Sequence, residues 1–164
     1  MKDFQLNIRR ISSEREKTAC AEILAGSETW ITLGIPMDYI MNILNDPLYE
    51  VFAAYVKDEI VGTMIIHTKG AFSGYLKSIA VKAGWRGKKL GEQMMEYIEM
   101  EIFSSYENLF LCVSSFNEDA QQFYIKLGYE QIGVLKDYLV AGHDEILMRK
   151  TVAPILERDR LNKK

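Results

Sequence analysis

The most regular pattern of apolar residues in this sequence is helical and lies in its second half. Charged residues separate apolar ones that recur every four positions: Leu90, Met94, Ile98 and Ile102. Such a stripe predicts a long helix with one buried face, beginning near Lys88. Apolar positions at i, i+3, i+4 and i+7 predict a second helix: Ala120, Phe123, Tyr124 and Leu127. Gly128 follows, and glycine often ends a helix.

Other stretches show the alternation or the continuous apolar run of a β-strand. They cover residues 4–9, 50–56, 60–68, 75–81, 109–113, 129–135 and 145–149. The short polar turn Lys57-Asp58-Glu59 separates the second from the third. We therefore expect these two strands to pair as an antiparallel hairpin.

The N-terminal region carries a recognisable helix start. Ser12-Ser13 followed by Glu16 is typical of a capped helix, here over residues 13–25. The next segment, residues 26–36, has no clear period and is expected to form a loop around Trp30.

A short helix over residues 37–45 should follow and stop before Pro47. The resulting order of elements predicts a single α+β domain over residues 1–164, with a mixed, mostly antiparallel sheet flanked by helices. The charged tail, residues 157–164, is expected to fray.

Composition narrows the class of protein without assigning a function. Of the 164 residues, 48% are hydrophobic and 26% are charged, which is ordinary for a globular protein. The net charge of -3 is unlike that of a general nucleic-acid binder, so no nucleic-acid partner is expected. No membrane span and no signal peptide are expected either, since neither apolar pattern occurs. The two cysteines, Cys20 and Cys112, are too far apart in sequence to suggest a disulfide scaffold or a metal site, and a cytoplasmic location is expected.

The loop before the long helix combines glycine with three cations. Its sequence is Lys82-Ala83-Gly84-Trp85-Arg86-Gly87-Lys88-Lys89-Leu90-Gly91. N–H groups at a helix start point outward and the helix dipole is positive there, while glycine lets a ligand approach the backbone closely. Arg86, Lys88 and Lys89 have the sign that this dipole disfavours, at about 0.3–1 kcal/mol each. A bound phosphate group would reverse that cost, so the loop is a candidate anion site.

The alternative is a solvated loop in which Gly87 makes a turn and the charges face water. The sequence has neither the G-x-x-x-x-G-K-[ST] pattern of a P-loop nor the G-x-G-x-x-G pattern of dinucleotide-binding folds. The loop residues by themselves therefore leave the kind of phosphate ligand open.

The segment from Ile79-Ala80-Val81 to Gly91 resembles the signature region of the GNAT superfamily of N-acetyltransferases. In that family a strand ending in a motif like I-A-V is followed by a short turn and by R/Q-x-x-G-x-G/A at the start of a long helix. Arg86, Lys89 and Gly91 occupy the matching positions. Lys89 departs from the usual glycine but retains the backbone N–H that a pyrophosphate needs.

A second segment agrees with the first. Residues 117–129, N-E-D-A-Q-Q-F-Y-I-K-L-G-Y, are similar to the later family motif N-x-x-A-x-x-F-Y-x-x-x-G-F/Y. They begin about 26 residues after Gly91, behind a predicted strand, as the family order requires. The element order from residue 4 to about 150 also matches, so the resemblance implies the GNAT fold for nearly the whole chain.

The resemblance implies acetyl-CoA as the cosubstrate and no metal. Residues 78–81 would splay from residues 109–114 and leave a V-shaped cleft for the cofactor. Cofactor-binding residues carry over to Ile79, Ala80, Val81, Arg86, Gly87, Lys88, Lys89, Leu90, Gly91, Asn117, Ala120 and Phe123. Main-chain groups of the first three would pair with pantetheine as an added strand does, and N–H groups of the loop would hold the pyrophosphate.

The resemblance also implies an acid but leaves the base open. Tyr124 matches the family tyrosine that protonates the departing sulfur, and a phenol with a pKa of about 10 can donate at neutral pH. A packing role on its helix is the alternative. Many family members have a glutamate on the strand before the loop, but residues 75–80 contain no acid. Glu28 is one candidate base and a water relay is another; Glu28 could equally be a solvated charge, and His67 and His143 are more typical of structural or solvated histidines.

The implied function is an N-acetyltransferase that moves the acetyl group of acetyl-CoA directly to an amine in a ternary complex. The amine could belong to a small molecule, a protein N-terminus or a lysine. An apolar wall for it, or simply core under the loop, could come from Trp30, Leu33, Ile35 and Tyr39. The alternatives are a non-catalytic acyl-CoA sensor of the same fold and a site for another phosphorylated ligand. Analogy leaves a homodimer open.

Overall fold

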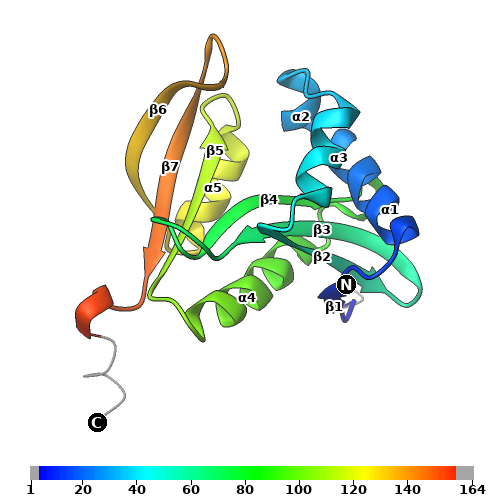
Figure 1. The fold of residues 1–164 in the computed structure, drawn as a ribbon, viewed down its shortest axis with the longest axis horizontal. Coiled ribbons are helices and arrows are strands. Elements are labelled where there is room, and N and C mark those ends of the chain that lie inside the picture. The colour runs from blue at the N-terminus through cyan, green and yellow to red at the C-terminus, as the bar shows by residue number, and fades with distance from the viewer. Residues whose placement is uncertain (1–3, 158–164) are drawn as a thin grey trace. The chain divides into compact units, whose positions relative to one another are not determined.

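The computed structural model describes residues 4–157 and confirms the α+β class. Within that range the strands form one seven-stranded mixed sheet in the order β1-β2-β3-β4-β5-β7-β6 (Figure 1). The strands are β1 (Asn7–Arg10), β2 (Tyr49–Val56), β3 (Glu59–His67), β4 (Tyr75–Val81), β5 (Asn108–Ser114), β6 (Glu130–Val140) and β7 (His143–Thr151). The helices are α1 (Glu14–Ala25), α2 (Glu28–Thr32), α3 (Met37–Asn45), α4 (Leu90–Phe103) and α5 (Glu118–Lys126), with 3-10 turns η1 (Ala83–Trp85) and η2 (Ile155–Glu157).

Most of the predicted elements are confirmed, several to within a residue. One prediction is wrong: residues 26–36 are not only loop, because they contain the short helix α2. Five residues are too few to show a helical period in sequence, and Ser27 at its N-cap makes no side-chain capping bond. The strands β6 and β7 are also longer than predicted, since they continue to the two-residue turn before His143.

The described chain forms two compact units. The first contains residues 4–67 and 77–98, and the second contains residues 68–76 and 99–157. Strand β4 contributes to both: its first two residues, Tyr75 and Leu76, pair in parallel with β5 in the second unit. The other described pairings, β1 with β2, β2 with β3, β5 with β7 and β6 with β7, are antiparallel.

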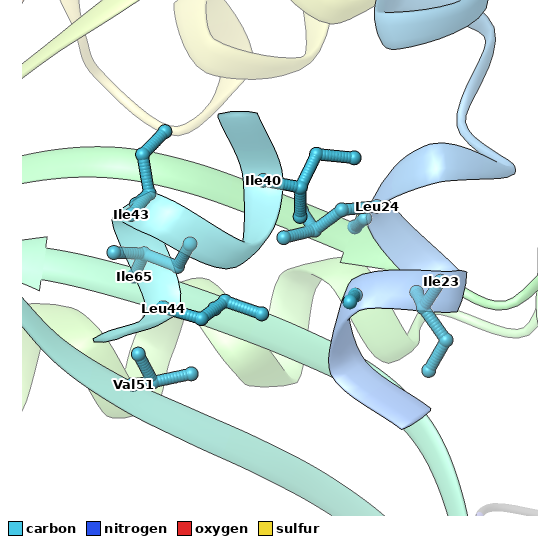
Figure 2. Packing of buried hydrophobic residues seen from close by; sticks show 9 residues of the cluster. Ile23, Leu24, Ile40, Ile43, Leu44, Val51 and Ile65 are labelled. Atoms are coloured by element: carbon cyan, nitrogen blue, oxygen red, sulfur yellow. The ribbon is translucent and has the colours of Figure 1, made fainter. Parts of the chain in front are cut away.

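One face of the β2–β3 hairpin in the first unit is covered by α1 and α3 (Figure 1). Figure 2 shows the core between them, where apolar side chains from both helices meet those of the strands: Ile23, Leu24, Ile40, Ile43, Leu44, Val51 and Ile65. Ala80 of β4 belongs to the same cluster. This packing fixes the strand that leads into the candidate loop.

The opposite face of the hairpin packs against α4. The rings of Phe52 and Tyr97 meet edge to face at 5.8 Å, and Met94 lies so close to Gly62 that a Cβ there would sit 2.7 Å from its sulfur. Residues alternate between faces along a strand, so neighbouring residues Val51 and Phe52 serve the two cores in turn. The amphipathic stripe predicted for α4 is confirmed, since Leu90, Met94, Ile98 and Ile102 are buried.

A buried carboxylate holds the start of α1. Ser13 is the N-cap and forms a capping box with Glu16, as the sequence predicted. Glu16 also accepts a 2.5 Å hydrogen bond from the Tyr55 hydroxyl and pairs with Arg9. Hydrogen bonds from Tyr55 and from the Ser12 backbone hold the pKa of Glu16 well below its usual range. This network ties α1 to strands β1 and β2.

The second unit is built on β5. Its inward residues Leu109 and Leu111 are almost fully buried, as is Met148 on the paired strand β7. At the start of β4, Gly74 has φ +84°, and a Cβ there would lie 2.3 Å from the Asn108 carbonyl oxygen. Glycine is therefore required where the chain enters this strand. Helix α5 ends before Gly128, whose φ of +89° confirms the predicted cap.

Candidate functional site

The loop between β4 and α4 contains two left-handed residues. After η1 the chain turns through Gly87 at φ +73° and Lys89 at φ +59°, and α4 begins only at Leu90. Glycine adopts this conformation without cost, whereas an L-residue such as lysine pays roughly 1–2 kcal/mol. Lys89 is therefore a strained residue at a position where the family pattern has glycine.

The main chain of this loop presents a run of unused donors. Arg86 N–H bonds back to Ala83, and Gln93 N–H makes the first helical bond to Lys89. Between them, the N–H groups of residues 87–92 have no hydrogen-bond acceptor among residues 4–157. A run of free donors at the positive end of a 14-residue helix is the geometry that binds a phosphate.

The three loop cations are not equivalent, because they differ in their contacts and in their distance along the chain from the helix start. Lys88 donates at 2.6 Å to the Gly84 carbonyl and lies over the Trp85 ring, 4.9 Å from its centroid. The Arg86 guanidinium donates to the Val81 carbonyl at 3.3 Å. Only Lys89 directly precedes the helix, because the left-handed residues delay its start.

Residues 79–81 have different surroundings along β4. Ala80 is buried in the core of the first unit, while Val81 packs near Leu90 and Trp85, and Ile79 is half-buried. The side chain of Ala80 is thus committed to packing in the core.

The later motif places its residues around the start of α5 in the second unit. Asn117 is the N-cap, and its side-chain oxygen accepts a 3.1 Å hydrogen bond from Ala120 N–H. The Asn117 side-chain oxygen and the Ala120 N–H are therefore used to cap the helix. Phe123 is half-buried, and its ring meets that of Tyr124 edge to face at 5.3 Å.

Tyr124 is buried to 7% exposure, and its hydroxyl has no hydrogen-bond partner within residues 4–157. Burial raises the pKa of its phenol well above the ordinary value. The side chain is therefore held neutral at physiological pH with a proton to donate, in a ring cluster with Phe123 and Tyr129.

Comparison with known protein families identifies the family to which the loop and the later motif belong. The family described as the Acetyltransferase (GNAT) domain matches residues 47–131, which include both the loop and the later motif. This chain belongs to the GNAT acetyltransferase family. No curated protein matches it in sequence.

Solved structures confirm the GNAT fold. An aminoglycoside 6'-N-acetyltransferase in complex with coenzyme A has a TM-score of 0.71 at 21% identity, covering 90% of this chain and 98% of its own. An acetyltransferase from Thermus thermophilus has a TM-score of 0.73 at 17% identity, with coverage of 93% and 100%. The ribosomal-protein-S18-alanine N-acetyltransferase from Escherichia coli has 0.73 at 16% identity, with 92% and 96%. At these identities the likeness concerns the fold.

Glu28, the base considered for this GNAT chain, is the first residue of α2 and is exposed. An acid in the first turn of a helix is favoured by the helix dipole, which explains a glutamate at this position without a catalytic role.

Of the residues considered for an acceptor wall, Leu33 is buried, and Trp30 and Ile35 pack against the core of the first unit. Tyr39 remains 42% exposed. Three of these four residues therefore serve as core.

The sequence analysis of this GNAT chain did not predict one buried polar pair. Glu145 of β7 is 3% exposed and Ser114 of β5 is 2% exposed, and the Ser114 hydroxyl donates to Glu145 Oε1 at 2.6 Å. The sequence gives a faint signal, because Glu145 directly precedes the apolar residues Ile146 and Leu147 of a strand. The pairing of strands that buries it is visible only in the structure.

The two histidines are each accounted for by an aromatic neighbour. His67 lies 5.6 Å from the ring of Tyr49, and His143 lies 5.4 Å from that of Phe116. Across residues 4–157, no group of three or more histidine, cysteine, aspartate or glutamate side chains is placed to hold a metal ion. The same residues include no helix long and apolar enough to cross a membrane.

Proposed function

We propose that this chain is an N-acetyltransferase that moves the acetyl group of acetyl-CoA directly to an amine in a ternary complex. The observation that carries the proposal is the run of free N–H groups at residues 87–92, in the loop where the family pattern predicts the cofactor pyrophosphate. Lys89 supports it further, because a strained cation at a helix start gains from a bound anion.

The cofactor is held, in this proposal, mainly by the backbone. N–H groups from Gly87 to Gly91 bind the pyrophosphate beside Arg86, whose own N–H bonds to Ala83, and main-chain groups of residues 79–81 pair with the pantetheine arm. Asn117, Ala120 and Phe123 line the cofactor from the later motif. Donors that are already oriented in the free protein need no reorganisation on binding.

Tyr124 is the general acid. The neutral amine attacks the thioester carbonyl, a C–N bond forms, and the C–S bond breaks as the tetrahedral intermediate collapses. The sulfur takes the phenolic proton of Tyr124, and the tyrosine recovers a proton from the acetylated nitrogen by way of solvent. Because burial raises the pKa of this phenol, the proton is present at the start of each turnover.

The acceptor is proposed to be a primary amine. One structural relative is an aminoglycoside 6'-N-acetyltransferase and another is a ribosomal-protein-S18-alanine N-acetyltransferase, so both a small cationic amine and a protein N-terminus belong in the test. The net charge of -3 weakly favours a cationic acceptor through long-range attraction.

Two measurements test this function. Acetyl-CoA and coenzyme A should raise the melting temperature, whereas ATP and NAD should not, since ligand binding to the native state stabilises it. Release of free thiol from acetyl-CoA should then be followed with kanamycin, spermidine, lysine and a peptide beginning with alanine. A chain that no acetyl-CoA concentration stabilises does not have this function.

The second candidate is a non-catalytic acyl-CoA sensor of the same fold. It is favoured by two observations: β4 carries no acid, and Glu28 is an exposed residue in the first turn of a helix. Stabilisation by acetyl-CoA without thiol release on any amine would select this function.

A further inference from the structure

The proposed reaction needs a group that takes a proton from the acceptor, because amines are mostly ammonium ions at neutral pH. Strand β4 contains no carboxylate. The second unit holds a different acid, Glu145, which is only 3% exposed to solvent although charged side chains are seldom buried without a specific reason.

The carboxylate of Glu145 is fixed by a directly opposing partner. Strands β5 and β7 pair without interruption from Asn108↔Thr151 to Ser114↔Glu145. Opposing residues of an antiparallel pair share a face of the sheet, and the Ser114 hydroxyl donates to Glu145 Oε1 at 2.6 Å. This bond stabilises the charged form and aims the carboxylate.

Ser114 also connects Glu145 to the helix that carries Tyr124. The main-chain carbonyl of Ser114 accepts the N–H of Asn117 at 2.9 Å and the side-chain amide of Gln121 at 3.3 Å. One residue thus holds the carboxylate with its side chain and the start of α5 with its backbone. The acid and the candidate base are therefore oriented by the same strand end, within one unit.

Tyr75 of β4 interacts electrostatically with Glu145, with Cys112 of β5 and with Tyr138 of β6. Burial, then Cys112, Tyr138 and Glu145 itself raise the pKa of Tyr75, so its hydroxyl stays protonated. Cys112 is half-buried and Tyr138 is 54% exposed. Glu145 therefore lies within electrostatic range of the Tyr75 hydroxyl, which in turn interacts with the half-buried Cys112 and the exposed Tyr138.

The same face of β7 continues on either side of Glu145. His143 and Arg149 are spaced two and four residues away, and both are half-buried. His143 contacts the ring of Phe116, and Arg149 opposes Phe110 in the register. Aromatic rings beside a carboxylate suit a primary ammonium group, which gains from both.

From this placement we propose that Glu145 is the general base of the acetyl transfer, receiving the ammonium group of the acceptor, and that Ser114 is its positioning residue. The inference rests on the proposed function. The carboxylate takes one proton from the ammonium and passes it to solvent; the neutral amine then attacks, and its second proton leaves as the amide forms. With Tyr124 supplying the proton for sulfur, one net proton is released per turnover.

The test compares Glu145→Gln with wild-type protein on the best amine of the panel. The variant should keep its melting temperature and its stabilisation by acetyl-CoA, and lose about 100-fold or more in kcat at neutral pH. Its rate should recover as the pH rises towards the pKa of the acceptor, because a free amine needs no protein base. Glu130→Gln, an exposed carboxylate on β6, is the control and should match wild type.

Ser114→Ala is the second variant and keeps the carboxylate in place. Loss of the hydroxyl donor should shift the acidic limb of the pH–rate profile to higher pH, since the charged form loses stabilisation. If Glu145→Gln does not fold, Ser114→Ala provides the test of Glu145 as the base. An acidic limb of the pH–rate profile at the same pH as in wild type overturns the inference. An active wild type with an equally active Glu145→Gln overturns the inference alone, whereas a wild type inactive on every amine overturns the proposed function and the inference together.

Discussion

The ring of Tyr124 stands edge-on to that of Tyr129, with centroids 5.7 Å apart, and the Tyr124 hydroxyl makes no hydrogen bond within residues 4–157. Tyr124→Phe therefore removes a proton donor without removing packing. We expect kcat to fall about 100-fold or more while acetyl-CoA still raises the melting temperature as in wild type. Steady-state kinetics and thermal melts measure the two effects.

Tyr129→Phe is the matched control, because it deletes the other hydroxyl of the same ring pair. The Tyr129 hydroxyl is buried without a well-formed hydrogen bond, although burial and the nearby Glu99 raise its pKa. Its removal should leave turnover unchanged and alter stability little. Equal activity of Tyr124→Phe and wild type would remove Tyr124 from the acid role.

Lys89→Gly should stabilise the free protein and weaken cofactor binding. Glycine relieves the left-handed strain at φ +59°, worth about 1 kcal/mol, which corresponds to a rise in melting temperature of roughly 2–4 °C. Loss of an exposed cation beside the pyrophosphate should weaken acetyl-CoA binding about two- to five-fold. Thermal melts with and without acetyl-CoA separate the two changes.

Lys57→Gly controls for strain alone. Lys57 has φ +54° in the turn between β2 and β3, outside the candidate loop. It should raise the melting temperature similarly and leave acetyl-CoA affinity unchanged. If Lys89→Gly binds acetyl-CoA as tightly as wild type, the side chain of Lys89 has no part in holding the phosphate.

Glu16→Gln should destabilise the protein most at neutral pH, and by progressively less as the pH falls below about 4. The Tyr55 and Ser12 donors lower the pKa of Glu16 in the folded state, so its contribution is complete above the unfolded pKa of about 4 and is lost as the pH falls further. We expect a loss of about 1–3 kcal/mol in the free energy of unfolding at pH 7. Urea unfolding from pH 7 to pH 3 measures it.

The gap between wild type and Glu16→Gln should narrow towards pH 3, because the charged carboxylate then contributes less to the stability of the wild type. Glu22→Gln, an exposed position on the same helix, should remain within about 0.5 kcal/mol of wild type throughout. A gap that stays constant with pH would show that the charge of Glu16 is not what stabilises α1.

Gly74→Ala should destabilise the second unit strongly. The added Cβ would meet the Asn108 carbonyl oxygen at 2.3 Å in a backbone at φ +84°, so the chain must shift where β4 enters beside β5. A loss of about 2 kcal/mol or more is expected from strain and displaced pairing. Gly133→Ala on β6, where a Cβ meets nothing within 4 Å, is the neutral control in the same urea titration.

Elements governed by local rules were predictable. The capping box of Ser13 and Glu16 places the start of α1, and the fourfold apolar spacing of α4 needs only the period of the helix. Helix α2 was not predicted, because its five residues contain less than two helical turns. The strands β6 and β7 were predicted too short because residues 136–144 carry charge, which an edge hairpin tolerates as easily as a loop does.

Some features of the candidate site could likewise be predicted from the sequence, and others could not. Each of the two family motifs is one continuous stretch of sequence. Family membership could therefore be predicted from residues 79–91 and 117–129. Two features of the loop could not be predicted from the sequence: Lys88 bonds back to Gly84, and Lys89 has a left-handed backbone. Both depend on where the loop turns.

By itself, the sequence determined most element types and the α+β class, and it predicted a phosphate site in the Arg86–Gly91 loop, because each follows from neighbours within a few residues. Tertiary structure alone decided that Glu145 is buried and that Ser114, 31 residues earlier, holds it. Burial and strand register depend on which distant segments pair, and no local pattern encodes the partner of a charged residue on a strand.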